Sequence, residues 1–123
     1  MAAKVDLFGI KNCDAMAKAR AWLAAHGVAY VFHDYKTEGV ERSRLQAWVQ
    51  QLGWEIVLNR AGTTFRALPD AAKADLNAAK AVKLMAAQPS MIKRPMLEAG
   101  GRLMAGFKPD AYSAFFGSGS GTK

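Results

Sequence analysis

Residues 5–23 read VDLFGIKNCDAMAKARAWL, and the character of this stretch changes at Gly9. Ahead of Gly9, the mainly apolar run VDLF at residues 5–8 is typical of a β-strand. The segment GIKNCD at residues 9–14 is polar and turn-like, and helical periodicity follows it. The stretch therefore predicts a strand, a turn and a helix, with Cys13 at the start of the helix.

The segments on either side of Gly27 extend this unit. Residues 14–26 predict an amphipathic helix, because apolar side chains recur at helical spacing at Met16, Ala19 and Leu23. Gly27 supplies its C-terminal stop. Residues 28–32 are rich in β-formers and predict a second strand, with turn residues at 36–39. A helix of this length can connect parallel strands, so the opening predicts a β-α-β unit.

The middle of the chain predicts a block of helices over residues 40–88. One helix carries apolar residues at positions i, i+3, i+4 and i+7 and is closed by Gly53; these residues are Leu45, Trp48, Val49 and Leu52. Asp70 and Asn77 are expected to cap one short and one longer helix, and Pro89 ends the longer one.

The last third predicts two strands and a helix. Residues 91–97 and 103–107 flank Gly100-Gly101, which is a hairpin signal. Pro109 opens a helix that ends at Phe116, and the Gly/Ser-rich residues 117–123 predict a flexible tail. The whole order predicts a single α/β domain over residues 1–116, with a mixed four-stranded sheet interrupted by the helical block.

Charge and cysteine content limit the classes of function. Lys and Arg number 17 against 10 Asp and Glu, a net charge of +7, so an anionic partner is expected. The basic residues are scattered and no nucleic-acid motif accompanies them, so nucleic acid is not the expected ligand. A single cysteine excludes a disulfide framework, and two separated histidines lack metal-ligand spacing. With no membrane-spanning run, we expect a cytoplasmic protein without a metal.

Cys13 is the candidate reactive group. A thiol at a helix N-terminus faces unpaired N–H groups and the positive end of the helix dipole, which favour the nucleophilic thiolate. The alternative is a small buried hydrophobic residue without chemistry. The polar neighbours Lys11, Asn12 and Asp14 favour a thiol presented on a loop.

Four segments carry a resemblance to a known family: GIKNCD at 9–14, KARAWL at 18–23, NRAGTTFR at 59–66 and PSMIKRPMLE at 89–98. In this order and spacing the chain resembles the arsenate reductase-like family, which contains glutaredoxin-coupled arsenate reductases, the Spx regulators and small YffB-type proteins. The sequence GFKP at 106–109, with Tyr112, is similar to the YffB type. The resemblance implies a thioredoxin-like fold.

The resemblance also implies roles for individual residues. Cys13 matches the family's nucleophile, Arg60 and Arg94 match two arginines that bind the oxyanion, and Pro95 matches a cis-proline. Arginine forks suit oxyanions and carboxylates and stabilise a thiolate. We expect Cys13, Arg94 and Arg60 to be catalytic. Glutathione is expected to contact the residues Lys11, Asn12, Arg94 and Pro95.

Two departures from the family pattern narrow the expected function. Met16 stands where Spx proteins carry a second cysteine, and Phe107-Lys108 stands where the reductases carry a third arginine. With one thiol, the expected activity is a monothiol, glutathione-dependent thiol reductase, with glutaredoxin as a further possible partner. The alternative is an Spx-like regulator that docks on RNA polymerase. A third hypothesis is a glutathione- and glutaredoxin-coupled arsenate reductase.

Overall fold

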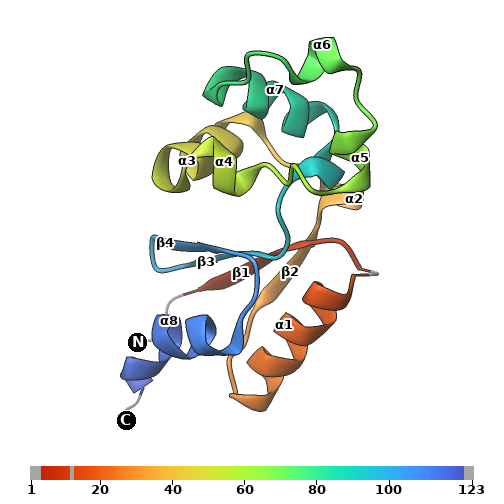
Figure 1. Ribbon diagram of the computed structural model, residues 1–123. Helices are drawn as coiled ribbons and strands as arrows, with labels where there is room; N and C mark the ends of the chain where they lie inside the picture. The colour runs from red at the N-terminus through yellow and green to blue at the C-terminus, as the bar shows by residue number, and fades with distance from the viewer. Residues whose placement is uncertain (1–3, 12, 121–123) are drawn as a thin grey trace.

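The computed structural model describes residues 4–11 and 13–120. Its centre is a mixed four-stranded sheet with the order β2-β1-β3-β4 (Figure 1). The strands are β1 (Val5–Gly9), β2 (Val31–Asp34), β3 (Met96–Ala99) and β4 (Arg102–Ala105). β1 runs parallel to β2 and antiparallel to β3, and β3 pairs with β4 in a hairpin. The predicted β-α-β and β-β-α halves are therefore confirmed.

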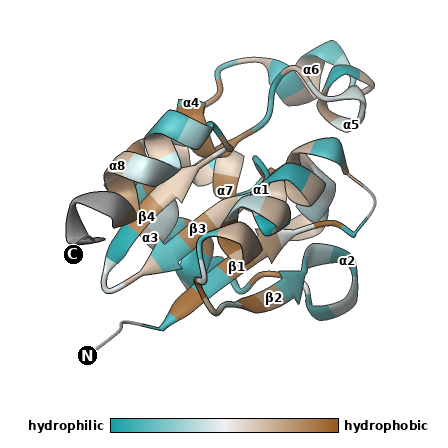
Figure 2. Ribbon diagram, turned by 90° about the horizontal axis from the view of Figure 1, so that it is seen from below, coloured by the Kyte–Doolittle hydropathy of each residue, from teal (hydrophilic) through white to brown (hydrophobic). Residues whose placement is uncertain are grey.

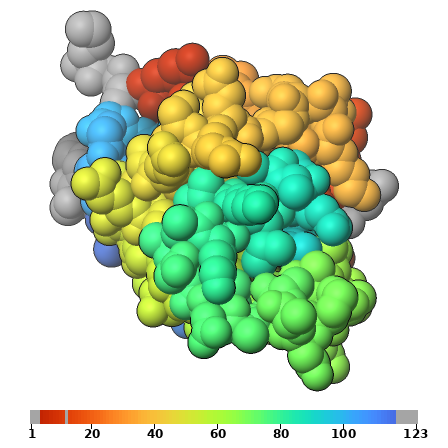
Figure 3. Space-filling model, turned by 90° about the horizontal axis from the view of Figure 1, so that it is seen from above, coloured from red at the N-terminus to blue at the C-terminus, as the bar shows by residue number. Residues whose placement is uncertain are grey.

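Helices cover both faces of the sheet (Figure 1). One face carries α1 (Asp14–Ala25) and α8 (Pro109–Ser120). The other carries the inserted block, whose elements are α2 (Tyr35–Glu38), α3 (Arg42–Leu52), α4 (Trp54–Val57), α5 (Thr63–Arg66), α6 (Asp70–Lys73), α7 (Ala78–Ala87) and the 3₁₀ turn η1 (Pro89–Met91). Figure 3 looks down on this block and shows α7 between α3 and the α5–α6 segment.

Side-chain alternation along the strands separates two hydrophobic cores. Leu7 of β1 and Leu97 of β3 pack with α1 and α8 in one cluster. Their neighbours in the same strands, Phe8 of β1 and Met96 of β3, face the inserted block and belong to a second cluster that contains Trp48. Figure 2 shows hydrophobic residues along β1 and β2. The sheet is therefore buried on both sides, because successive residues of a strand point to opposite faces.

Two strands are shorter than the sequence predicts. β2 begins at Val31 rather than residue 28, because the Val28 N–H donates to the Leu23 carbonyl (2.9 Å) at the end of α1. The strand expected over 91–97 begins only at Met96. Proline has no N–H with which to join a ladder, so regular pairing starts after Pro95.

Several boundaries of the helices also differ from expectation. The turn expected at 36–39 is the short helix α2, whose Lys36 N–H donates to Oδ1 of Asp34 (2.9 Å). Asn77 caps α7 as predicted, but Asp70 lies inside α6, where Pro69 is the cap residue. α8 continues past Phe116 to Ser120, because glycine and serine weaken a helix without forbidding it. The rest of the predicted tail, residues 121–123, lies outside the described residues.

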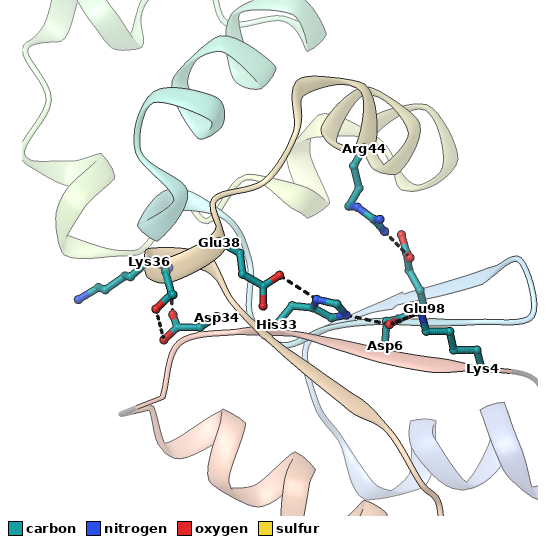
Figure 4. Close-up of polar contacts among 9 residues, drawn as sticks. Lys4, Asp6, His33, Asp34, Lys36, Glu38, Arg44 and Glu98 are labelled. Atoms are coloured by element: carbon teal, nitrogen blue, oxygen red, sulfur yellow. Dashed lines mark hydrogen bonds and ion pairs between the residues drawn. The ribbon is translucent and has the colours of Figure 1, made fainter.

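A row of polar side chains lies on the inserted-block side of the sheet (Figure 4). His33 of β2 bridges two carboxylates, with Nε2 2.8 Å from Oδ1 of Asp6 and Nδ1 2.9 Å from Oε1 of Glu38. Lys4 lies 3.7 Å from the same Asp6 oxygen. Partial burial lowers the pKa of His33, but the hydrogen bonds and negative charges of Asp6 and Glu38 outweigh it and raise the pKa above its ordinary value.

This bridge predicts a pH-dependent stability. Because the folded pKa of His33 is raised, its protonated form stabilises the fold below the ordinary pKa of about 6.5, and the contribution is lost as pH rises through the folded pKa. We expect His33→Gln to remove about 0.5–1 kcal/mol of stability at pH 5 and less at pH 8. Urea unfolding across this range measures the difference. His26→Gln, at an exposed histidine, is the matched control, and parallel curves for wild type and His33→Gln would contradict the prediction.

Candidate active site around Cys13

Cys13 is the N-cap residue of α1, with extended backbone angles (φ −145°, ψ 130°). Its carbonyl accepts the first helical hydrogen bond, from the Ala17 N–H at 3.0 Å. The side chain is partly exposed and stands beside the N–H groups of the first turn, which have no partner inside the helix. The sequence prediction that Cys13 begins the first helix is therefore confirmed.

Gly9 and Met16 hold the turn that carries Cys13. Met16 is fully buried, and its side chain crosses directly over Gly9 at the end of β1. A Cβ atom added to Gly9 would lie 2.1 Å from Sδ of Met16, a separation that no real side chain tolerates. Met16, at the position where the resemblance places the second cysteine of Spx proteins, therefore packs between the end of β1 and helix α1.

The surroundings of Cys13 favour its thiolate. Partial burial raises the pKa of the thiol, but three groups act in the opposite direction: the Met16 N–H, the Arg94 guanidinium and the Ala15 N–H. Together they lower the pKa of Cys13 below its ordinary value. The sequence predicted the first cause, the helix N-terminus, and the family resemblance implied the second, an arginine neighbour. A partly exposed thiol with a lowered pKa is suited to nucleophilic attack on a disulfide.

Arg94 is held in place through its own side chain. Nη1 donates to the Ser90 carbonyl at 3.1 Å, and the Ser90 hydroxyl donates to Oγ1 of Thr64 at 3.1 Å. Nε of Arg94 is buried and has no hydrogen-bond partner among the described residues. The guanidinium, which acts on the Cys13 thiol, therefore has one donor without a protein partner among the described residues. Thr64 of α5 thus supports Arg94 through Ser90, and no signal in the sequence pointed to this role.

The backbone next to Arg94 is also fixed. The Arg94–Pro95 peptide bond is cis, as the resemblance implied, and Pro95 is buried. Ahead of it, the Lys93 N–H donates to the Val57 carbonyl at 2.7 Å. The Lys93 carbonyl accepts a hydrogen bond from the Tyr35 hydroxyl at 3.0 Å. These contacts tie the segment to α2 and to the end of α4 (Figure 1).

Tyr35 is a supporting residue that sequence reasoning missed. Its ring is 1% exposed, and burial raises the pKa of its phenol well above the ordinary range, although the nearby Arg94 charge acts in the opposite direction. The phenol therefore stays protonated as a hydrogen-bond donor. The hydrogen-bond partner of Tyr35 lies 58 positions away in the chain, so the residues around Tyr35 give no signal of this role.

The remaining predicted site residues lie in different places. Arg60 is exposed, with its guanidinium 5.3 Å from the Trp54 ring centroid. The groups that act on the Cys13 thiol are Arg94 and the first turn of α1, and Arg60 is not among them. Lys11 is exposed, and Asn12 lies outside the described residues. Phe107, at the place of the third arginine, packs edge-on against Tyr112 with 4.7 Å between ring centroids.

Across residues 4–11 and 13–120, no cluster of three or more His, Cys, Asp or Glu side chains is placed to hold a metal ion. Within the same ranges, no helix has the length and apolar character needed to cross a membrane.

A parallel β-α-β unit joined to an antiparallel hairpin, with a thiol at the first helix and a cis-proline before the third strand, defines the thioredoxin-like class of proteins. The model of the ArsC family matches residues 8–115, so the chain belongs to the ArsC family. The resemblance seen in the sequence is thereby confirmed.

Relatives and solved structures agree with this assignment. An uncharacterized protein of Haemophilus influenzae is 36% identical over 112 residues, which cover 91% of this chain and 98% of that protein. The global transcriptional regulator Spx of Streptococcus pyogenes is 30% identical, over 90% of this chain and 84% of the regulator. The solved YFFB protein is 63% identical, with a TM-score of 0.88 over 90% of this chain and 97% of that one. An arsenate reductase-related protein from Brucella melitensis is 54% identical, with a TM-score of 0.74 over 93% and 95%.

Proposed function

We propose that this protein is a monothiol thiol–disulfide reductase that uses glutathione as its external thiol. The observation that carries the proposal is the Cys13 thiol, which is partly exposed and has its pKa lowered by the Met16 N–H, Arg94 and the Ala15 N–H. Low-pKa, accessible thiols are the reactive ones in redox proteins. Cys13 is the only cysteine in the chain, so the second thiol must come from outside.

The chemistry is two successive thiol–disulfide exchanges. The Cys13 thiolate attacks one sulfur of a disulfide, a new bond forms from Sγ to that sulfur, and the old bond breaks. The departing thiolate takes the electron pair and then a proton from water. Glutathione, or a glutaredoxin, then gives up its thiol proton to water and attacks the substrate-derived sulfur of the mixed disulfide. A bond forms between these two sulfurs, the bond to Sγ breaks, and the Cys13 thiolate leaves with the electron pair. The departing half of the substrate is thus reduced to a thiol, and the external thiol ends oxidised in the new disulfide.

Mass spectrometry after incubation with oxidised glutathione tests this proposal. We expect wild-type protein to gain one glutathionyl group at Cys13, reduced glutathione to remove it, and Cys13→Ser to gain none. Alkylation of Cys13 across the pH range gives an independent measure of the thiol pKa. An unchanged mass, together with a pKa near that of a free thiol at about 8.5, would exclude the function.

A regulatory role is the second candidate, because the Spx of Streptococcus pyogenes matches this chain across 90% of its length. In this alternative the protein docks on RNA polymerase and Cys13 is a sensor or has no function. A stoichiometric complex with the polymerase that persists in Cys13→Ser would favour binding over catalysis. Trapping of several thiol partners through Cys13 would favour catalysis.

Arsenate reduction is the third candidate function. Arg94 has a buried Nε without a partner among the described residues, which suits an oxyanion. However, Arg60 lies against Trp54, and Phe107 packs on Tyr112 at the place of the third arginine. A tetrahedral oxyanion bound at Cys13 would therefore have one arginine partner, Arg94.

A further inference from the structure

A surface depression lies where the inserted block meets the start of the last hairpin. Its volume is about 610 Å³, and its lining includes Glu55, Asn59, Arg60, Lys93 and Ala105. Backbone pairing holds the walls together, because Leu58 forms a bridge with Ile92 and the Asn59 N–H donates to the Met91 carbonyl at 2.8 Å. The depression is therefore a built part of the fold.

The depression lies at the end of the sheet where β1 leads into the turn that carries Cys13. Phe8, near the end of β1, pairs with Met96, and Met96 pairs with Ala105 at the end of β4. Neighbouring strands are about 4.8 Å apart, so Ala105 lies about 10 Å across the sheet from the end of β1. An extended peptide covers about 3.4 Å per residue. An extended peptide thiol of about three to four residues is therefore long enough to span from the end of β1, where the turn to Cys13 begins, to Ala105 in the lining.

One chain segment joins the two places. Arg94, which acts on the Cys13 thiol, directly follows Lys93, which lines the depression. The Lys93 side chain runs beside Gly106, where an added Cβ would lie 3.6 Å from its Cε. Arg60 also lines the depression, and its guanidinium lies 5.3 Å from the Trp54 ring centroid. The lining thus carries two cations and one carboxylate, Glu55, among apolar and amide side chains.

We propose that Arg60 and Lys93 form a carboxylate-binding subsite in this depression, which selects anionic peptide thiols for reaction at Cys13. This inference rests on the proposed function and, of the two roles expected for Arg60, keeps anion binding and leaves out stabilisation of the thiolate. Arginine and lysine side chains bind carboxylates through charge-assisted hydrogen bonds. Glu55 suits the ammonium group that a free peptide also carries.

The test compares two small disulfides that differ in charge. Dithiobis(nitrobenzoate) carries a carboxylate on each half, whereas dithiodipyridine is neutral, and both release a coloured thiol when Cys13 attacks. We expect Arg60→Ala and Lys93→Ala each to lower the ratio of the anionic to the neutral rate about two- to fivefold. Glu55→Gln should raise this ratio. Salt should reduce it for wild type, because ions screen exposed charges beyond about 8 Å at physiological strength.

Arg66→Ala is the matched control, because Arg66 is an exposed arginine on α5 outside the lining. If Arg66→Ala lowers the ratio as much as Arg60→Ala, net charge explains the selectivity and the subsite is refuted. An unchanged ratio in Arg60→Ala and Lys93→Ala refutes it as well. Failure of the proposed function looks different, since wild-type Cys13 would then react with the neutral disulfide at the pH profile of an ordinary thiol.

Discussion

Replacing Arg94 by alanine is expected to slow the reaction of Cys13 with a neutral disulfide about tenfold at pH 7. Partial burial of Cys13 opposes the thiolate, and the Arg94 guanidinium is among the groups that outweigh burial. Without that charge the pKa of Cys13 rises, and a smaller fraction of the protein carries the thiolate at neutral pH. Stopped-flow measurements with dithiodipyridine over a range of pH check this result.

The shape of the pH profile separates activation from damage. A thiolate of higher pKa is intrinsically more nucleophilic, so Arg94→Ala should equal or exceed wild type once both thiols are fully ionised. Arg94→Lys keeps a charge and should fall between the two. Arg94 also donates to the Ser90 carbonyl, so urea unfolding must confirm that the variant remains folded. Superimposable pH profiles for wild type and Arg94→Ala would show that Arg94 does not activate Cys13.

Gly9→Ala is expected to lower the free energy of unfolding by about 1–3 kcal/mol, the usual cost of overpacking a core. The new Cβ would lie 2.1 Å from Sδ and 2.7 Å from Cε of Met16. Met16 is fully buried, so its side chain can move only by displacing other core residues. Chemical denaturation of the purified variants measures the loss. Gly62→Ala is the control, because the close contact of its Cβ is with the movable end of the Asn59 side chain, 2.9 Å from Nδ2, and the Asn59 carbonyl lies at an ordinary contact distance of 3.7 Å.

A double-mutant cycle shows whether the Met16 contact is the cause. Met16→Ala alone should cost about 2–5 kcal/mol, because it leaves a cavity in the core. Combined with Gly9→Ala, it should cost clearly less than the sum of the two single changes, since the shorter side chain makes room for the new methyl group. Additive costs would place the defect of Gly9→Ala elsewhere in the turn.

The local pattern predicted elements whose stability comes from nearby residues. α1 and α3 have apolar residues at helical spacing and end at glycine, and the final hairpin turns on Gly100-Gly101. Their approximate positions were therefore readable. The start of β3 was not, because residues 91–93 pair with Val57, Leu58 and Asn59, and pairing within the sheet begins only after Pro95. Those contacts join segments more than 30 positions apart.

The residues of the candidate site also differ in whether the sequence near them could identify them. Cys13 could be identified from its own neighbours, because a turn and a helix start are local features of the chain. Arg94 could be identified only through the family resemblance. Nothing in the chain near Tyr35, Ser90 or Thr64 indicates that they support the segment around Arg94, since their hydrogen bonds depend on how α2, α5 and η1 pack.

The sequence by itself determined the order of the four strands and the longer helices, the solitary thiol at a helix N-terminus and the absence of a second cysteine. These properties depend on residue identity and on spacing within single segments. The tertiary structure alone decided which arginine acts on Cys13 and which lies in a separate depression with Lys93. The physical reason is that a charge acts on a thiol according to distance in space, and distance is set by packing between segments remote in the chain.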